Sequence, residues 1–452
     1  MKKVLSFFIL IFSFRVCAQT GDIEQRIKKL EEVLINQSNI ISEQRKEIEE
    51  LKAEIEALKH QSQKEATNNA VSSSPEKIEL KPTGLFGSSN LMNPNISVVV
   101  DTSAYTSNLN KKELGERFLP GFDFPPPQGN ELYNKGFHFN YAELYLYAPV
   151  DPYFNLYTTI PFSENGSEVE EAYFLTSSLP KGLQFKGGKF KSAFGRLNSQ
   201  HEHTWDFSDA PLPYRAFLGE EGLTDTGLQI NYVPQTQFYL DIGGELFQGS
   251  NEMLFGKEAK NGPHCYTLFA KTSFDCGTNS TILTGLSLIK GEARNWSVNS
   301  DSQFTGKSSL YDFEFTYKWK KSKYKGFTLQ SEYLYRKQNG DVEGKEFGGY
   351  LNRHQDGFYI QGVYLFGNGR WRIGSRYDRL NLFSDSYKLN EENLYFGKDP
   401  YRISFMAEYN PTEFSRIRFQ YNHDKSYRFQ KTNREFILQL IFGIGAHAAH
   451  SF

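Results

Sequence analysis

The sequence predicts an all-β fold: an antiparallel transmembrane β-barrel of about sixteen strands, preceded by an α-helical coiled coil. Three observations predict it. The chain begins with an export signal, runs of about ten residues from Pro94 onward alternate between apolar and polar side chains, and 15% of the 452 residues are aromatic, including 27 Tyr and 39 Phe. No later segment offers about 20 consecutive apolar residues, so a helical membrane span is excluded. A chain that crosses a membrane without such a helix must close its backbone hydrogen bonds in a barrel.

The first eighteen residues have the features of a secretory signal peptide. Lys2 and Lys3 form a positive start, Val4 to Phe14 an apolar core, and Ala18 ends a cleavage site before Gln19. A lipoprotein signal at Cys17 is the alternative, but the residues before it are not the small ones that such a signal requires. The mature protein is therefore expected to leave the cytoplasm.

Residues 19–60 are predicted to form a coiled coil, because core positions recur at alternating spacings of three and four. One core position holds Ile27, Leu34, Ile41, Ile48 and Ile55, and the other Ile23, Leu30, Gln37, Gln44, Leu51 and Leu58. The flanking charges fit a parallel assembly. Ile and Leu in these positions favour a dimer, whereas the buried Gln layers favour a trimer, which is the preferred prediction. A single amphipathic helix packed on the barrel is the alternative.

Residues 61–93 are polar and read as a linker, and the barrel is predicted over 94–452. Short turns follow every second candidate strand, for example at Pro149 to Pro152 and at Gly367 to Arg370. Long polar loops separate the other strands, near residues 106–135, 191–225, 248–263, 291–306, 338–354 and 381–398. In outer-membrane barrels the short turns lie on the periplasmic side, so the sequence predicts that orientation.

The two faces of the strands can be assigned from parity. In the candidate strand from Leu310 to Trp319, five aromatic side chains alternate with Asp312, Glu314 and other polar residues, so we expect the aromatic face toward lipid and the polar face toward the lumen. By the same argument the predicted pore-lining residues are Arg372, Arg376, Arg416, Arg418, Glu332 and Glu408.

The chain ends on a run of alternating apolar residues that closes with Phe452. A last strand with a terminal Phe resembles the signal that barrel-assembly machinery recognises, so Phe452 is the predicted assembly signal. His447 and His450 lie nearby but on opposite faces of that strand, so they are not expected to chelate a metal.

Two resemblances extend this reading. A coiled coil followed by about sixteen strands resembles the phosphate-selective porin family, which implies a trimer and an anion path lined by basic side chains. The motifs at Ile96 to Asp101, Val169 to Phe174 and Gly188 to Gly219 are similar to poorly characterised proteins labelled zinc-regulated TonB-dependent outer membrane receptors. That resemblance implies a link to zinc.

The loop at 191–225 is the main candidate site. In porins the third long loop folds into the lumen, and its predicted constriction residues here are His201, His203, Asp206, Asp209 and Arg215. His201, His203 and Asp206 are also the predicted ligands of a zinc ion. The alternative is that these side chains hydrogen-bond the loop to the barrel wall. The HEHTW segment does not match HExxH, so a zinc protease is excluded.

These patterns predict a porin-like channel for passive diffusion of small hydrophilic or ionic solutes in the outer membrane of a Gram-negative cell, with the coiled coil in the periplasm. The alternatives are a structural protein tethered through its coiled coil and a zinc-linked uptake protein. No hydrolase, P-loop or dinucleotide fingerprint stands in a plausible context, so neither enzyme activity nor a cofactor is expected; an outer-membrane phospholipase is the rival enzyme class. A net charge of -2 gives no reason to expect nucleic acid as a partner. The expected partners are outer-membrane lipid, barrel-assembly machinery and two further copies of the chain.

Overall fold

The computed structural model describes residues 94–119, 121–122, 134–256, 261–299, 302–344, 348–395, 399–427 and 431–445. The chain divides into two units, Met1–Pro82 and Thr83–Phe452, and every described residue belongs to the second. The predicted signal peptide, coiled coil and linker lie outside the described residues, as do His447, His450 and Phe452.

All strands of the described ranges join one antiparallel sheet of eighteen strands, two of which, β4 (Gly166–Ser167) and β15 (Glu392–Asn393), are only two residues long. The sixteen longer strands are β1 (Asn95–Ser107), β2 (Gly136–Pro149), β3 (Phe154–Ser163), β5 (Glu171–Thr176), β6 (Leu183–Lys191), β7 (Thr224–Tyr232), β8 (Tyr239–Phe247), β9 (Cys265–Asp275), β10 (Ser280–Asn299), β11 (Ser302–Ser322), β12 (Lys325–Gly344), β13 (Gly349–Phe366), β14 (Trp371–Leu389), β16 (Tyr401–Thr412), β17 (Ser415–Asp424) and β18 (Asn433–Gly445).

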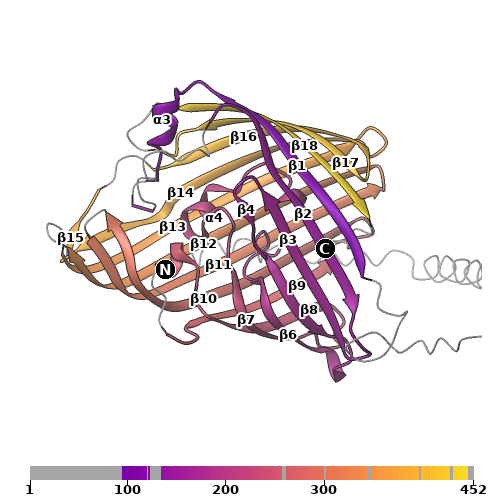
Figure 1. Cartoon of the computed structure of the whole chain (residues 1–452), viewed down its shortest axis with the longest axis horizontal. Helices are drawn as coiled ribbons and strands as arrows, with labels where there is room; N and C mark the ends of the chain where they lie inside the picture. Colours follow the sequence, from indigo (N-terminus) through magenta and orange to yellow (C-terminus); the bar gives the residue numbers. More distant parts are fainter. Residues whose placement is uncertain are drawn as a thin grey trace, which may run out of the picture. The chain divides into compact units, whose positions relative to one another are not determined.

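The first and last strands close the sheet on itself. β1 pairs with β18 from Ser97 opposite Gly445 to Ser107 opposite Glu435, so neither strand has a free edge there (Figure 1). β1 also pairs with β2, and β18 with β17. A closed ring of this kind satisfies the backbone of every strand without water, which a membrane requires. The predicted antiparallel barrel of about sixteen strands is therefore confirmed.

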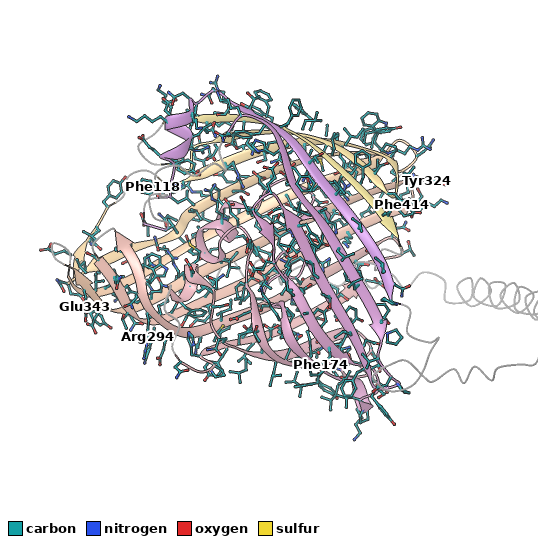
Figure 2. All side chains as sticks on the ribbon, viewed as in Figure 1. Phe118, Phe174, Arg294, Tyr324, Glu343 and Phe414 are labelled. Carbon is teal, nitrogen blue, oxygen red and sulfur yellow. The ribbon has the colours of Figure 1, made fainter. Side chains whose placement is uncertain are left out.

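Short turns gather at one end of the barrel and long connections at the other. Figure 2 shows Tyr324 and Phe414, which lie in short turns, at the end opposite Arg294 and Glu343. The short helix η2 (Pro180–Gly182) lies in a short turn. The other helices of the described ranges lie in the long connections. They are α3 (Lys111–Gly115), η3 (Glu202–Thr204), α4 (Leu212–Leu218) and α5 (Glu252–Phe255). None of the described helices is long and apolar enough to span a membrane.

Three predicted loops were wrong. The segments near 291–306, 338–354 and 381–398 are mostly strand, because β10 to β14 are 18 to 21 residues long. Transmembrane strands need only about ten residues, so these hairpins continue beyond a membrane's thickness. Past that level polar side chains are tolerated on the outer face, and a polar stretch then no longer distinguishes a loop from a strand.

The alternation of faces follows the prediction. In β11, Asp312 and Glu314 are buried on the inner face while Tyr311 is exposed on the outer face. Exposed outward residues such as Phe405, Phe419 and Leu438 continue this apolar surface around the sheet. A second apolar cluster lies inside the barrel, where α4 packs against inner-face residues of the long strands, among them Ile289, Leu310, Leu334 and Leu380.

Candidate functional site in the barrel lumen

The connection between β6 and β7, residues 192–223, enters the barrel; we call it the lumen loop. Asn198 ties its two ends together, since its Nδ2 donates to the carbonyls of Ser192 at 2.9 Å and Leu223 at 3.0 Å. The Leu223 N–H returns a bond of 2.7 Å to Asn198 Oδ1. With its base fixed in this way, the loop contacts the inner wall at several places, and four of these contacts involve predicted site residues.

The first contact is Glu332, which lies on β12 and is fully buried. Its carboxylate accepts hydrogen bonds from the backbone N–H of Arg196 at 2.7 Å and of Leu197 at 3.1 Å. The hydroxyl of Tyr214 on α4 donates at 2.6 Å, and that of Tyr359 on β13 completes the set. Four donors around one buried carboxylate compensate for its lost hydration, so Glu332 anchors both the start of the loop and α4.

The second contact joins two aspartates of the loop to basic residues of the opposite wall. Asp206 pairs with Arg372 and accepts from Gln361 at 3.1 Å. Asp209 accepts from four side chains: Arg376 at 2.5 Å, Arg402 at 2.9 Å, Gln420 at 2.8 Å and Asn422 at 2.9 Å. Burial alone would raise the pKa of Asp209, but the Arg402 and Arg376 guanidinium groups hold it well below its usual range.

The third contact uses the loop's backbone. Arg416 donates to the carbonyl of His203 at 2.7 Å, and Arg418 to that of Trp205 at 2.6 Å. Both guanidinium groups also lie near Glu408, at 3.5 Å and 2.8 Å. Glu408 pairs with Arg372 at 2.9 Å as well, so one buried carboxylate organises three arginines beneath the loop.

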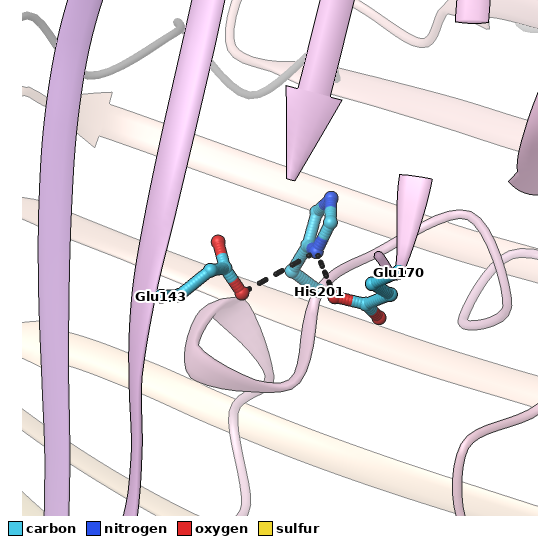
Figure 3. Close-up of side chains that lie close together, drawn as sticks. All are labelled: Glu143, Glu170 and His201. Carbon is cyan, nitrogen blue, oxygen red and sulfur yellow. Dashed lines mark ion pairs between the residues drawn. The ribbon is translucent and has the colours of Figure 1, made fainter. Parts of the chain in front are cut away.

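The fourth contact lies at the loop tip, where two histidines meet glutamates of β2 and the start of β5. His201 Nδ1 lies 3.3 Å from Glu170 Oε2 and 3.6 Å from Glu143 Oε2 (Figure 3). His201 Nε2 lies 2.9 Å from Glu171 Oε2. His203 Nδ1 lies 3.5 Å from Glu143 Oε2. We call these five residues the histidine–glutamate cluster.

The electrostatics of the cluster follow from its composition. Burial alone would lower the pKa of His201, but the neighbouring carboxylates of Glu170, Glu171 and Glu143 outweigh it and raise the pKa to about 10. The neighbouring Glu202 has its pKa raised to about 7 by burial, against the opposing effect of Lys191. Positive charge on His201 therefore offsets part of the negative charge of the neighbouring glutamates.

The structure separates the residues predicted for zinc. His201 and His203 are adjacent, with ring centroids 5.8 Å apart and ring planes at 22°. Asp206 instead lies against Arg372 and Gln361, so the predicted set of His201, His203 and Asp206 is corrected. The Asp206 carboxylate is already paired with the Arg372 guanidinium group. The carboxylates beside the histidines are those of Glu143 and Glu170.

The predicted pore-lining residues all lie at inward-facing positions, but their side chains differ in exposed surface. Arg376, Arg418, Glu332 and Glu408 are buried under the loop. The side chains of Arg372 and Arg416 keep 20% and 24% of their surface exposed. The predicted constriction residue Arg215 pairs with Glu220 of the loop itself, at 3.5 Å.

Sequence reasoning missed Glu170, Glu171 and Lys191 as partners of the loop. Lys191 Nζ pairs with Glu170 at 2.6 Å, and its backbone N–H donates to Glu171 at 2.8 Å. The adjacent pair of glutamates within the VEEAYF motif was the available signal. It could not show that the loop tip returns to β5.

A second group of carboxylates, on the inner wall, was not predicted from the sequence. Asp312, Glu314 and Glu332 lie together on β11 and β12, with ligand oxygens within 4.8 Å of one another. Glu314 stands directly opposite Glu332 in the strand register. Lys271 approaches Glu314 at 3.5 Å and donates to the Gly195 carbonyl of the loop at 2.6 Å.

Sequence comparison with known proteins identifies a relative of this chain. No family model matches the chain. A protein of Aquifex aeolicus (strain VF5), described as uncharacterized, is 42% identical over 379 residues, which cover 79% of this chain and 80% of that protein. The chain belongs to the same family as this Aquifex protein.

Solved structures similar to the chain include three outer-membrane proteins. OmpT of Vibrio cholerae is 12% identical, with a TM-score of 0.48 over 79% of this chain and 99% of that one. The DcaP channel of Acinetobacter baumannii is 11% identical, with a TM-score of 0.49 over 78% and 97%. An anion-selective porin from Comamonas acidovorans is 7% identical, with a TM-score of 0.48 over 78% and 100%. Identities this low carry no substrate from those proteins to this family member.

Proposed function

We propose that the protein is a porin-like channel of the outer membrane of a Gram-negative cell, through which small hydrophilic or ionic solutes diffuse passively. The observation that carries the proposal is the lumen loop, which lies inside a closed barrel and binds the inner wall through charged side chains. A loop held in this position narrows whatever aqueous path the barrel encloses. Its contacts with β12, β14, β16 and β17 fix that constriction.

The outer surface supports insertion into lipid. Large apolar side chains such as Phe137, Leu286 and Ile373 are exposed on the outward face, where water would not favour a continuous apolar surface. An outward apolar band around a closed antiparallel barrel is what outer-membrane barrels present to lipid. The proposed location follows from this band together with the predicted signal peptide.

The inner surface supports passage of polar solutes. Asp206, Arg372 and Arg416 keep 17%, 20% and 24% of their side-chain surface exposed. Charged groups with this residual exposure retain part of their hydration, which a dry plug would not allow. Both signs of charge occur there, so the proposal includes no selectivity for anions.

Homo-trimer assembly, contact with barrel-assembly machinery and a periplasmic coiled coil are parts of the same proposal that rest on the sequence alone. The heptads support the trimer, and the terminal Phe452 supports recognition by the assembly machinery. No enzymatic role is proposed.

Single-channel recording in planar bilayers tests the proposal. We expect conductance steps from the wild-type protein and steps several-fold larger after deletion of Ser199 to Leu218, a deletion that keeps Asn198 to tie the loop ends. A second variant, Asp206→Ala with Asp209→Ala, should release the loop without removing it. Asp341→Ala with Glu343→Ala is the matched control, because it removes two exposed carboxylates from the end of β12.

Heat-modifiable migration in gels establishes that each variant contains a folded barrel. A folded wild-type protein without any conductance would overturn the proposed channel. Unchanged conductance in both loop variants would show that the lumen loop does not set the size of the path.

A further inference from the structure

The histidine–glutamate cluster brings together nitrogen and oxygen donors from two distant parts of the chain. His201 and His203 come from the tip of the lumen loop, Glu143 from β2, and Glu170 from the residue before β5. Figure 3 shows Glu143, Glu170 and His201 pointing toward one another. One ligand atom from each of these three residues lies within 4.8 Å of the other two.

The surrounding contacts orient each donor. Glu171 Oε2 lies 2.9 Å from His201 Nε2, so a proton on Nε2 leaves Nδ1 as the lone-pair donor. This arrangement, in which a carboxylate binds the far nitrogen of a histidine, is the usual support of metal-ligating histidines. Lys191 Nζ pairs with Glu170 Oε1, so the other oxygen, Glu170 Oε2, faces His201. Nδ1 of His201 is buried and makes no hydrogen bond within the described residues.

The separations match those between ligands of a small tetrahedral ion. Bonds of about 2.0–2.2 Å to nitrogen and oxygen place neighbouring ligands of a tetrahedron about 3.3–3.6 Å apart. The separations in the cluster are 3.3 Å between His201 Nδ1 and Glu170 Oε2, 3.6 Å between His201 Nδ1 and Glu143 Oε2, and 3.5 Å between His203 Nδ1 and Glu143 Oε2. A hydrogen-bonded ion pair would be shorter and better aligned.

We propose that this cluster is a binding site for one divalent transition metal ion of the Zn²⁺ type. Nδ1 of His201 and one carboxylate oxygen each of Glu143 and Glu170 are the three ligands that already lie together. Nδ1 of His203, 3.5 Å from Glu143 Oε2, would move toward them to become the fourth. Two imidazoles with two carboxylates select such an ion over Ca²⁺ or Mg²⁺, which prefer oxygen ligands alone. The Asp312, Glu314 and Glu332 group has no histidine and is not part of this proposal.

A bound ion would also restrain the lumen loop. It would link the tip of the lumen loop to β2 and to the residue before β5, in addition to the hydrogen bond that Arg416 of β17 donates to the His203 carbonyl. The loop would then be fixed at its tip as well as through Glu332 and Asp209. This site does not depend on conduction, because binding can be measured on a barrel that carries no current.

Metal binding to the full-length, tag-free protein tests the proposal. The protein is stripped with a chelator, dialysed against Zn²⁺ and analysed for bound metal, and X-ray absorption reports the ligands. We expect one Zn²⁺ per chain with nitrogen and oxygen neighbours at about 2.0–2.1 Å. We expect His201→Ala with His203→Ala, and separately Glu143→Gln with Glu170→Gln, to weaken binding at least tenfold.

The matched control is His354→Ala with Glu343→Gln, which removes one histidine and one glutamate far from the loop. Heat-modifiable migration confirms that each variant is folded, and the glutamine variant preserves side-chain shape if the histidine variant fails to fold. Zn²⁺ retained equally by a folded cluster variant and the control would overturn the proposal. Absence of bound Zn²⁺ from the wild type, or sulfur neighbours in its absorption spectrum, would also overturn it and would leave an ion-paired cluster only.

Discussion

The hydroxyl of Tyr214 donates to Glu332 Oε2 at 2.6 Å and joins α4 of the lumen loop to β12 of the wall. Both side chains are buried. Burial and the adjacent Glu332 carboxylate raise the pKa of Tyr214 well above its usual value, so its hydroxyl stays protonated and remains a donor. The lumen loop is thus attached to the wall through α4 as well as through Asp206 and Asp209.

Tyr214→Phe should destabilise the folded barrel by about 1–3 kcal/mol, because it removes one donor from a buried carboxylate and leaves the ring in place. The free energy of unfolding in urea, measured on detergent-solubilised protein, checks this. Tyr311→Phe is the control, since Tyr311 is exposed on the outward face and should change that free energy by less than about 0.5 kcal/mol. Equal effects of the two substitutions would contradict the anchoring role of Tyr214.

Asp209→Asn should cost about 3–5 kcal/mol of stability, because it removes the charge that two buried arginines share. The sign of its pH dependence follows from the depressed pKa of Asp209. The stabilisation is fully present above the unfolded value of about 3.9 and is lost only as pH falls through the lower folded value. The difference in unfolding free energy between wild type and Asp209→Asn should therefore be constant from about pH 5 to 8 and shrink below about pH 4.

Glu220→Gln provides the comparison for Asp209, since the Glu220 side chain is 57% exposed and its ion pair contributes little. If Asp209→Asn were no more destabilising than Glu220→Gln, the contacts of Asp209 with Arg376 and Arg402 would not hold the loop. Protease cleavage after Arg215 gives a second readout, because a released loop becomes accessible.

Arg416→Gln should shift the channel toward cations, by roughly twofold in the permeability ratio, because it removes a partly exposed positive charge from the inner wall. Glu408 keeps Arg372 and Arg418 as partners, so the fold should persist. The reversal potential in a salt gradient measures the shift. Arg294→Glu, at the exposed end of β10, should leave it unchanged, and an equal shift in both variants would argue against a path beside Arg416.

Strand count and the facing of side chains could be predicted because both depend on a local period of two. Tyr311 and Asp312 fall on opposite faces wherever their strand pairs, so neighbouring residues suffice for that assignment. The ends of β10 to β14 could not be found in the same way. Beyond the membrane, hydrogen bonding between strands maintains them without an apolar face.

Partners of the lumen loop could not be predicted because they depend on where a closed barrel brings remote strands. Asp206 meets Arg372, 166 positions along the chain, and His201 meets Glu143, which precedes it by 58. The sequence identifies the loop as rich in charge and histidine. Which wall each side chain reaches is decided by barrel closure and by the anchoring of the loop at Asn198 and Glu332.

The segment from residue 19 to 60 should form a parallel helical oligomer by itself, because its heptads bury Ile and Leu between chains. Circular dichroism and sedimentation of the peptide check this, with a trimer as the expected mass. Gln37→Ile with Gln44→Ile should raise its melting temperature and alter the number of chains, since buried polar layers cost stability and specify the assembly. A monomeric, unfolded peptide would remove the basis for the trimer.

Removal of Phe452, or Phe452→Asp, should block insertion while export continues. The last described strand, β18, exposes Phe436, Leu438, Phe442 and Ile444 on its outward face, and Phe452 has the same parity in the sequence. An apolar end to this stripe is what a membrane-facing strand requires, whereas a charge there opposes entry into lipid. Fractionation should find the processed variant in the periplasm without a heat-modifiable band, and Phe452→Trp, which keeps an aromatic terminus, should insert normally. A normal amount of heat-modifiable barrel in the outer membrane of the Phe452→Asp strain would show that closure of β18 on β1 suffices for assembly.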